Sequence, residues 1–298
     1  MKSNTMCALR RDHDGIQCTH VPVPEVSAEE VILEVEIAGI CRTDVDVANG
    51  AIRLARPTIL GHEFGGRVLE AEDLRIGERV AINPILNCGH CTACKANMPR
   101  SCAHAAMLGV DRDGAFAERI SVPRSAVFPV GQDVPVKHLA YVEPMAATLG
   151  VAQLELPGRV GITGSGRITR LCKRVLHALD VDVVPLDGNT APHSIGVVIE
   201  CTGMAEGLQL AVDCTEPGGL VVLKSRRPQP AAVNFMPAVR KELRFQGVHY
   251  GDFAMAVDWM QQERINIDDL LGPVLPLQDW KTAFEAAEGS KVFLDPRL

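Results

Sequence analysis

The sequence predicts an α/β protein of two domains, one mainly β and one built on a doubly wound parallel sheet. Its length of 298 residues is sufficient for two domains. Residues 31–37, VILEVEI, alternate apolar and acidic side chains, as a half-buried strand does. From residue 159 the pattern becomes apolar strand, glycine turn and helix, which is typical of βαβ units. We therefore expect the parallel sheet in the second half of the chain.

Composition limits the classes of partner. A hydrophobic content of 47% and a charged content of 22% are ordinary for a soluble globular protein. The net charge of −7 argues against nucleic acid or acidic lipid as the main partner. No run approaches the ~18 apolar residues of a membrane span, and the N-terminal sequence MKSNTMCALRRDHDG has no apolar signal core. Ten cysteines with clustered spacing fit a reducing compartment, so we expect a cytoplasmic protein.

The strongest motif is the segment 88–102, CGHCTACKANMPRSC. It spaces four cysteines by gaps of two, two and seven residues: Cys88, Cys91, Cys94 and Cys102. Short gaps allow one tight loop to present several thiolates to a zinc ion, which binds four of them tetrahedrally. Unrelated thiols or a disulfide pair are the alternatives. A four-cysteine site leaves no open coordination position, so this zinc is expected to be structural.

A second metal site is indicated by residues upstream of this loop. Gly39 ends the strand at 31–37 and places Cys41 at the start of a turn or helix, while the segment ILGHEFGGRV supplies His62 and Glu63. A lone cysteine is usually a small buried hydrophobe, and a lone histidine is usually structural. Taken together, Cys41 and His62 are a candidate pair of ligands for one metal ion.

The order of these motifs resembles that of the zinc-dependent medium-chain alcohol and polyol dehydrogenases. The motifs occur in the family's order: Cys-x-Thr-Asp, Gly-His-Glu and then the four-cysteine loop. The match continues in three further segments, INPILNCGHCTAC, GAFAERISVP and VEPMAATLGV. The resemblance implies a GroES-like catalytic domain at 1–145 and 261–298. It also implies a Rossmann-like NAD-binding domain at 146–260.

The resemblance also assigns roles to individual residues. Cys41 and His62 correspond to ligands of a catalytic zinc, and Glu63 corresponds to a neighbouring carboxylate that binds the zinc directly, binds it transiently or contacts one of its ligands. Glu143 stands where alcohol dehydrogenases have a second cysteine and polyol dehydrogenases have a glutamate, which favours the polyol, sugar or threonine branch. A catalytic zinc keeps one position open and makes a bound alcohol more acidic.

The proton path of the family is matched only in part. Thr43 corresponds to the hydroxyl residue that accepts the alcohol proton, after which a hydride passes to the nicotinamide. Many polyol and threonine dehydrogenases have a histidine three residues later, where this chain has Asp46. Asp46 is expected either to continue the proton path or to cap the following helix.

A cofactor site is predicted at the glycine turn of the βαβ unit. Gly164 and Gly166 allow a pyrophosphate to approach backbone amides at a helix N-terminus. Asp187, 23 residues after Gly164, is placed to bind the adenosine ribose and to repel a 2′-phosphate, which predicts NAD over NADP. The third glycine of the fingerprint is replaced by Thr169. The predicted cofactor-binding set is Gly164, Ser165, Gly166, Arg167, Ile168 and Asp187.

This domain is shorter than in the family. After Asp187 the segment GNTAPHS leads straight into IGVVIECTG, which resembles the fourth strand of the Rossmann sheet. The third strand and its flanking helices are therefore expected to be absent. About eight residues must then cross from strand two over strand one, a span of ~26–29 Å that only an extended chain can reach. Loss of a wall of the adenine site predicts weaker NAD binding than in full-length relatives.

We therefore expect a zinc-dependent oxidoreductase with one catalytic and one structural zinc. Its substrate is expected to be a small secondary alcohol, polyol or sugar-like molecule, and its cofactor NAD(H). The alternative is a catalytically impaired dehydrogenase fold that acts as a zinc-stabilised binding or regulatory module. A third possibility is that the shortened site accepts an unusually bulky substrate. Relatives in the family imply a homo-oligomer, a dimer or a tetramer.

Overall fold

The computed structural model describes residues 4–27 and 29–298. The chain forms two compact units, Met1–Glu143 with Phe253–Leu298 and Pro144–Asp252. The expected boundaries place residues 253–260 with the cofactor domain, whereas here they belong to the first unit. None of the helices in the described residues is long and apolar enough to cross a membrane.

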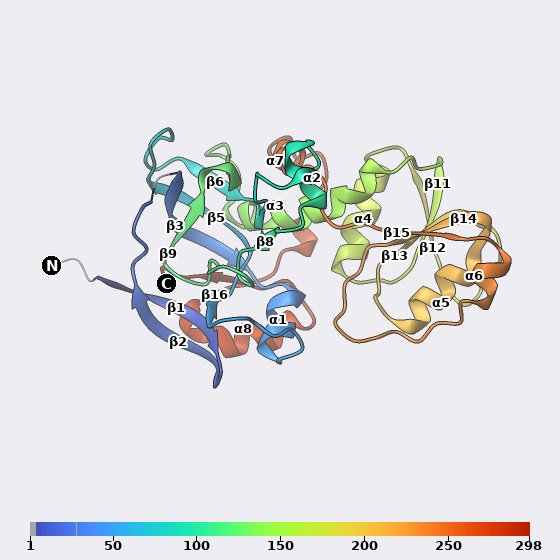
Figure 1. The fold of residues 1–298 in the computed structure, drawn as a ribbon, viewed down its shortest axis with the longest axis horizontal. Coiled ribbons are helices and arrows are strands. Elements are labelled where there is room, and N and C mark those ends of the chain that lie inside the picture. Colours follow the sequence, from blue (N-terminus) through green and yellow to red (C-terminus); the bar gives the residue numbers. More distant parts are fainter. Residues whose placement is uncertain (1–3, 28) are drawn as a thin grey trace. The chain divides into compact units, whose positions relative to one another are not determined.

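The first unit is mainly β (Figure 1). A three-stranded sheet has the order β2 (Gly15–Pro22), β1 (Thr5–Asp12), β4 (Thr58–Ile59). The larger sheet has the order β10 (Val127–Pro129), β6 (Arg79–Ile82), β5 (Glu63–Glu70), β3 (Glu30–Gly39), β17 (Phe293–Asp295), β16 (Val274–Pro276), and β9 (Arg119–Pro123) pairs with β3. A separate two-stranded antiparallel sheet pairs β7 (Ile85–Leu86) with β8 (Ala106–Met107). The segment expected at 31–37 thus lies in the central strand.

Five α-helices begin in the first unit: α1 (Arg42–Ala48), α2 (Thr92–Lys95), α3 (Val136–Leu149), α7 (Phe253–Gln261) and α8 (Trp280–Ala287). Short 3-10 turns lie at Pro99–Ser101, Arg124–Ala126, Gly150–Gln153, Asp268–Leu270 and Leu277–Asp279, the third of them in the second unit. The unit's core is formed by apolar side chains of β3, β5 and β6, with Phe116 and Phe284 in edge-to-face contact at 6.2 Å between ring centres. The apolar face of α8 therefore closes the core beside the sheet.

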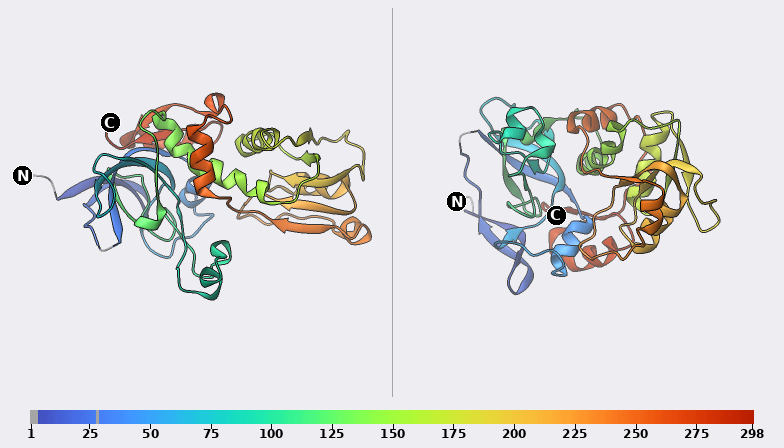
Figure 2. Two further views of the ribbon diagram at one scale, coloured as in Figure 1. Left: turned by 90° about the horizontal axis from the view of Figure 1, so that it is seen from above. Right: turned by 45° about the vertical axis from the view of Figure 1, so that its right-hand side comes forward.

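The second unit contains five parallel strands in the order β12 (Asp182–Pro185), β11 (Arg159–Ile162), β13 (Ile195–Glu200), β14 (Thr215–Leu223), β15 (Arg244–Gly247) (Figure 2). Its helices are α4 (Arg167–His177), α5 (Ala205–Cys214) and α6 (Met236–Arg240). Helix α4 contacts β12, and α5 contacts β13 and β14. In the Rossmann order 3-2-1-4-5-6, this sheet is 2-1-4-5-6. The prediction of a parallel sheet without its third strand is confirmed.

The segment 186–194 makes the shortened crossover from β12 to β13. It contains turns and no helix, as its length requires. Backbone amides of His193 and Ser194 donate to the carbonyls of Asp213 and Cys214, at 3.1 and 2.9 Å. The end of α5 therefore supports a connection that helices would support in a full Rossmann domain.

Helix α3 contains a proline in its interior. It runs unbroken from Val136 to Leu149 with Pro144 inside it. A proline within a helix removes one amide donor and normally causes a kink. Thr148 hydroxyl donates to the Pro144 carbonyl at 2.8 Å, and the surrounding turn is almost wholly buried. Tertiary packing thus outweighs the local preference for a break.

Candidate functional site

The four cysteines of the loop come together as a metal-ligand set. Their sulfur atoms all lie within 4.8 Å of one another. The Sγ–Sγ distances are 4.0 Å for Cys88–Cys94, 3.9 Å for Cys91–Cys102 and 3.6 Å for Cys88–Cys102. A tetrahedral zinc with sulfur at ~2.3 Å requires sulfur–sulfur edges of about 3.8 Å. The arrangement therefore fits zinc, and none of these cysteines forms a disulfide.

The loop's backbone holds the sulfurs in place. Cys91 is the N-cap of α2, and its amide donates to the Cys88 sulfur at 3.4 Å. The Cys88 amide donates in turn to the Cys102 sulfur, also at 3.4 Å. Asn97 takes a positive φ of 57°, which turns the chain back toward the fourth ligand. In the left view of Figure 2 this segment protrudes from the rest of its unit. Backbone hydrogen bonds to sulfur favour thiolates, the form that binds zinc.

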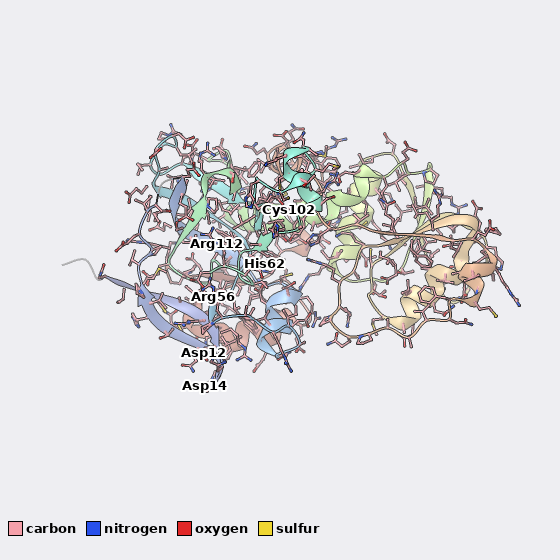
Figure 3. All side chains as sticks on the ribbon, viewed as in Figure 1. Asp12, Asp14, Arg56, His62, Cys102 and Arg112 are labelled. Carbon is pink, nitrogen blue, oxygen red and sulfur yellow. The ribbon has the colours of Figure 1, made fainter. Side chains whose placement is uncertain are left out.

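A second cluster joins Cys41, His62 and Glu63, whose ligand atoms lie within 4.8 Å of one another. Cys41 caps α1, and Glu63 begins β5 directly after His62. Gly39 and Glu63 are paired in the ladder of β3 and β5, which brings the two segments together. Figure 3 shows His62 in the body of the first unit and Cys102 in the protruding loop. The structure therefore unites residues that lie 22 positions apart in the sequence.

The burial of His62 without hydrogen bonds is the clearest indication of a metal site. Its side chain is fully buried, and neither ring nitrogen has a hydrogen-bond partner. Leaving a buried polar atom unpaired costs ~1–3 kcal/mol, so such atoms usually have a function. Burial lowers the pKa of His62, but the charges of Asp44 and Cys41 raise it well above its ordinary value. The two anionic neighbours thus favour a positive charge at this position, and a zinc ion fits the donor set.

The Cys41 thiol is prepared to act as a ligand. Burial raises its pKa, but the charge of His62 lowers it to about 6. A thiolate is therefore the main form at neutral pH, as metal binding requires. Thr43 is the second residue of α1, with its hydroxyl oxygen 3.9 Å from the Cys41 sulfur.

Asp44 is a residue of the site that the sequence reasoning missed. One carboxylate oxygen accepts the Cys41 amide at 2.8 Å, which completes a capping box at the start of α1. The other accepts the Gly61 amide at 3.2 Å and lies 3.4 Å from His62 Nδ1. The signal was available, because an acidic residue three positions after a helix N-cap is typical of this box. Asp46, the expected alternative for the cap, lies inside α1 and does not cap it.

Lys291 is a second residue that was missed. Its ammonium forms a buried ion pair with the Glu63 carboxylate and donates to the Ile40 carbonyl at 3.2 Å. Burial lowers the pKa of Lys291 to about 8, so it is still cationic at neutral pH. A Cβ at Gly39 would lie 2.5 Å from the Lys291 nitrogen, so this pair requires glycine there. No local motif links two residues 228 positions apart.

We expect the substitution Lys291→Met to lower the free energy of unfolding by about 3–5 kcal/mol, because it leaves the buried Glu63 carboxylate without its cation. Urea denaturation measures the change. The double variant Glu63→Gln with Lys291→Met is expected to regain part of the loss. Lys137→Met, which removes a half-buried lysine that donates to a backbone carbonyl at 2.7 Å, is the control. Equal stabilities of Lys291→Met and wild type would contradict the assignment.

Glu143 is not among the side chains that gather at this cluster. It lies in α3 and is buried, with 4% of its surface exposed. The close group contains Cys41, His62 and Glu63, and within the described chain no fourth acidic or sulfur ligand meets the same distance limit. Its role as a ligand is still a prediction from the sequence.

The glycine turn of the second unit leads directly into helix α4. Gly164 has a φ of +88°, and a Cβ there would lie 2.9 Å from Thr202 and 3.1 Å from the Thr169 hydroxyl. Gly166 caps α4, so the backbone amides of Arg167 and Ile168 lie at the N-terminus of the helix. Thr169, the substitute for the third glycine, is buried and its hydroxyl has no partner. Helix α4 therefore accommodates Thr169 in place of glycine, but the threonine hydroxyl is left without a hydrogen bond.

Asp187 lies beyond β12, exposed to solvent. One carboxylate oxygen accepts the Asn189 amide at 2.9 Å and the Thr190 hydroxyl at 3.3 Å. These contacts fix the carboxylate at the carboxyl end of the parallel strands, where open α/β sheets bind ligands. Ser165 is exposed in the turn between the two glycines.

Comparison with known proteins gives consistent matches. The alcohol dehydrogenase GroES-like domain matches residues 27–132. The L-threonine 3-dehydrogenase of Mesorhizobium japonicum is 26% identical, covering 98% of this chain and 99% of the relative. That alignment runs over 346 residues, more than the 298 of this chain, so the relative contains residues that this chain lacks. The corresponding protein of Anaeromyxobacter sp. (strain K) is 28% identical, with 95% and 96% covered.

Solved structures of dehydrogenases also match this chain. A zinc-binding dehydrogenase from Sinorhizobium meliloti 1021, determined with bound NADP, has a TM-score of 0.87 at 27% identity and covers 99% of this chain and 100% of its own. The L-idonate 5-dehydrogenase of Escherichia coli has a TM-score of 0.88 at 22% identity, with 98% of both chains covered. At that identity the second match speaks for the fold alone.

Proposed function

Because this chain belongs to the zinc-dependent medium-chain dehydrogenase/reductase family and is an NAD(P)-linked oxidoreductase, we propose that it oxidises a secondary alcohol, polyol or sugar-like substrate with NAD⁺ at a zinc site. The observation that carries the proposal is the buried, unpaired imidazole of His62 beside the Cys41 sulfur. A second zinc would be held by Cys88, Cys91, Cys94 and Cys102. The first site would be catalytic and the second structural.

The residues of the first unit would have separate roles in metal binding and proton transfer. Cys41 and His62 hold the metal, which supplies Lewis acidity that lowers the pKa of an alcohol bound in an open position. Asp44 accepts the Cys41 amide and so fixes the ligand, while Lys291 binds the Glu63 carboxylate. Thr43 is half-buried two residues after Cys41 and would accept the hydroxyl proton by hydrogen bond. Glu143 remains a candidate ligand.

The nicotinamide cofactor would bind the second unit through Gly164, Ser165, Gly166, Arg167 and Ile168. Backbone amides at the start of α4 are suited to a pyrophosphate, and the helix of 11 residues adds a favourable dipole. The missing third strand removes one side of the adenine pocket. We infer weaker NAD binding than in relatives with a complete sheet.

Asp187 should set the choice of NAD over NADP, since a carboxylate repels a 2′-phosphate. We expect Asp187→Ser to reduce the preference for NADH over NADPH by about tenfold, about 1.4 kcal/mol. Paired fluorescence titrations with NADH and NADPH measure the ratio of the two dissociation constants. Asp182→Ser, an exposed aspartate at the opposite end of β12, is the control. An unchanged ratio in Asp187→Ser would remove this residue from the cofactor site.

The competing function is a zinc-stabilised binding or regulatory module that has lost turnover. The replacement of the third fingerprint glycine by Thr169 and the shortened sheet favour it. The buried cluster of Cys41, His62 and Glu63 argues against it, because sites without a function are not expected to retain unpaired buried polar groups.

Metal analysis followed by a substrate screen separates the two functions. The dehydrogenase should contain about two zinc ions per chain and reduce NAD⁺ with at least one member of a panel of polyols, sugars and β-hydroxy amino acids. Absorbance of NADH reports turnover. A module should contain zinc in the four-cysteine loop only and stay inactive with every member of the panel, which would reject the proposed function.

A further inference from the structure

A pair of thiols lies outside both candidate metal sites, in the hairpin of β1 and β2. Cys7 is paired with His20, and Leu9 is paired with Cys18, so the two cysteines are diagonal neighbours on one face of the hairpin. Their sulfur atoms are 3.0 Å apart. A disulfide bond measures ~2.05 Å, so the two sulfurs need to approach by only about 1 Å to be joined.

We propose that Cys7 and Cys18 form a redox modification site that closes to an intramolecular disulfide by exchange with a small-molecule disulfide. Cross-strand neighbours in a hairpin share a face, and the 3.0 Å between the two sulfur atoms shows that these side chains already reach each other. The reducing compartment expected for this chain would keep the pair as thiols, and an oxidising shift in the thiol pool would close it.

Metal binding is the competing explanation of two adjacent thiols. A zinc site needs at least three protein ligands. Across residues 4–27 and 29–298, the groups of three or more candidate ligands are the two sites already described, and neither contains Cys7 or Cys18. The pair therefore lacks the further ligands that would make it a metal site.

The two thiols differ in solvent exposure, and this difference determines which of them reacts first. Cys18 is the one exposed cysteine of the ten in the chain, whereas Cys7 is half-buried. Burial and then the hydrogen bond with Cys18 raise the pKa of Cys7 to about 12. Because the thiolate is the attacking species, the exposed Cys18 is the site of first reaction.

The reaction proceeds in two exchanges. The Cys18 thiolate attacks one sulfur of the small disulfide RSSR, forming a mixed disulfide and releasing RS⁻, which takes up the proton lost by Cys18. The Cys7 sulfur then attacks Cys18 and loses its proton to the second RS⁻ that departs. In total the protein dithiol is oxidised by two electrons, and RSSR is reduced to two RSH.

The bond would fix a strand that supports the catalytic unit. The Leu9 amide donates to the Phe116 carbonyl at 2.7 Å, and the Leu60 amide donates to the Leu9 carbonyl at 3.1 Å. The Cys7 amide donates to the Glu118 carboxylate at 2.9 Å. A disulfide that closes a loop of about ten residues stabilises chiefly by restricting the unfolded chain. We expect the melting temperature of the oxidised protein to be higher by about 5 °C or more.

The test uses the full-length, zinc-loaded protein in buffers of graded glutathione to glutathione disulfide ratio. After acid quenching and alkylation, trypsin and a glutamate-specific protease cut the chain between the two cysteines, into residues 3–10 and 12–25. These peptides stay joined only through a Cys7–Cys18 disulfide. We expect the joined peptide to accumulate as the buffer becomes oxidising, while the zinc content stays constant.

Two variants serve as controls. Cys18→Ser should show no rise in melting temperature on oxidation, whereas Cys201→Ser, which alters a half-buried cysteine in the other unit, should behave as wild type. The proposal is overturned if Cys18 retains glutathione while Cys7 is alkylated, or if zinc loss precedes any joining of the two peptides. It is also overturned if both thiols stay free in glutathione disulfide alone.

Discussion

The substitution His62→Ala is expected to remove one of two zinc ions and to lower turnover by at least about 10³-fold, since the metal would lose a ligand and the alcohol its activation. His62 is fully buried and neither ring nitrogen forms a hydrogen bond, although Nδ1 lies 3.4 Å from the Asp44 carboxylate, so a bound metal would satisfy this side chain. Zinc per chain is measured by mass spectrometry of the metal, and turnover by NADH formation. Cys41→Ser should give the same pair of losses.

A matched control separates loss of the ligand from loss of the fold. His177→Ala alters an exposed histidine at the end of α4 and should leave the zinc content unchanged. The far-ultraviolet circular dichroism of His62→Ala should match that of wild type. A His62→Ala protein that still contains two zinc ions would show that the metal is held elsewhere.

The substitution Cys94→Ser is expected to release the other zinc and to unfold the loop 88–102. Its sulfur belongs to a set of four, and zinc binding by such sets contributes on the order of 10 kcal/mol to folding in small zinc domains. Residues of α2 are exposed or half-buried, so little apolar packing holds the loop in the absence of metal. Limited trypsin digestion should cut at Lys95 and Arg100, and metal analysis should find one zinc fewer.

The control for Cys94→Ser is the substitution Cys18→Ser, with zinc content and trypsin resistance measured under reducing conditions. Cys18→Ser removes a cysteine outside both clusters and should retain all zinc and all resistance to trypsin. If Cys94→Ser retained its full zinc content and resisted trypsin as wild type does, the loop would be stable without zinc.

The sequence was most informative where function depends on spacing within a short segment. The gaps between Cys88 and Cys102 determine that one loop can bring four sulfurs together, and the structure places them at distances suited to zinc. The missing third strand was also predictable, because too few residues separate β12 from β13 to form it. Both conclusions rest on chain length, which tertiary context cannot alter.

Features that depend on packing or on distant pairs were not predictable. Lys291 reaches Glu63 because β17 lies beside β3, and this placement follows from the whole sheet. The helix α3 continues through Pro144 since its surroundings are buried. Asp44 is an intermediate case, because its capping box was visible in the sequence but its contact with His62 was not.

The measurement that tests the central claim most directly is an NADH titration, followed by fluorescence, of purified protein whose zinc has been counted. We predict saturable binding in the micromolar range to protein with about two zinc ions per chain, and weaker binding of NADPH. This result needs no knowledge of the substrate, and it would justify the screen of polyols and sugars. Absence of binding at millimolar NADH, with both zinc sites filled, would contradict the assignment of the second unit as a working cofactor domain.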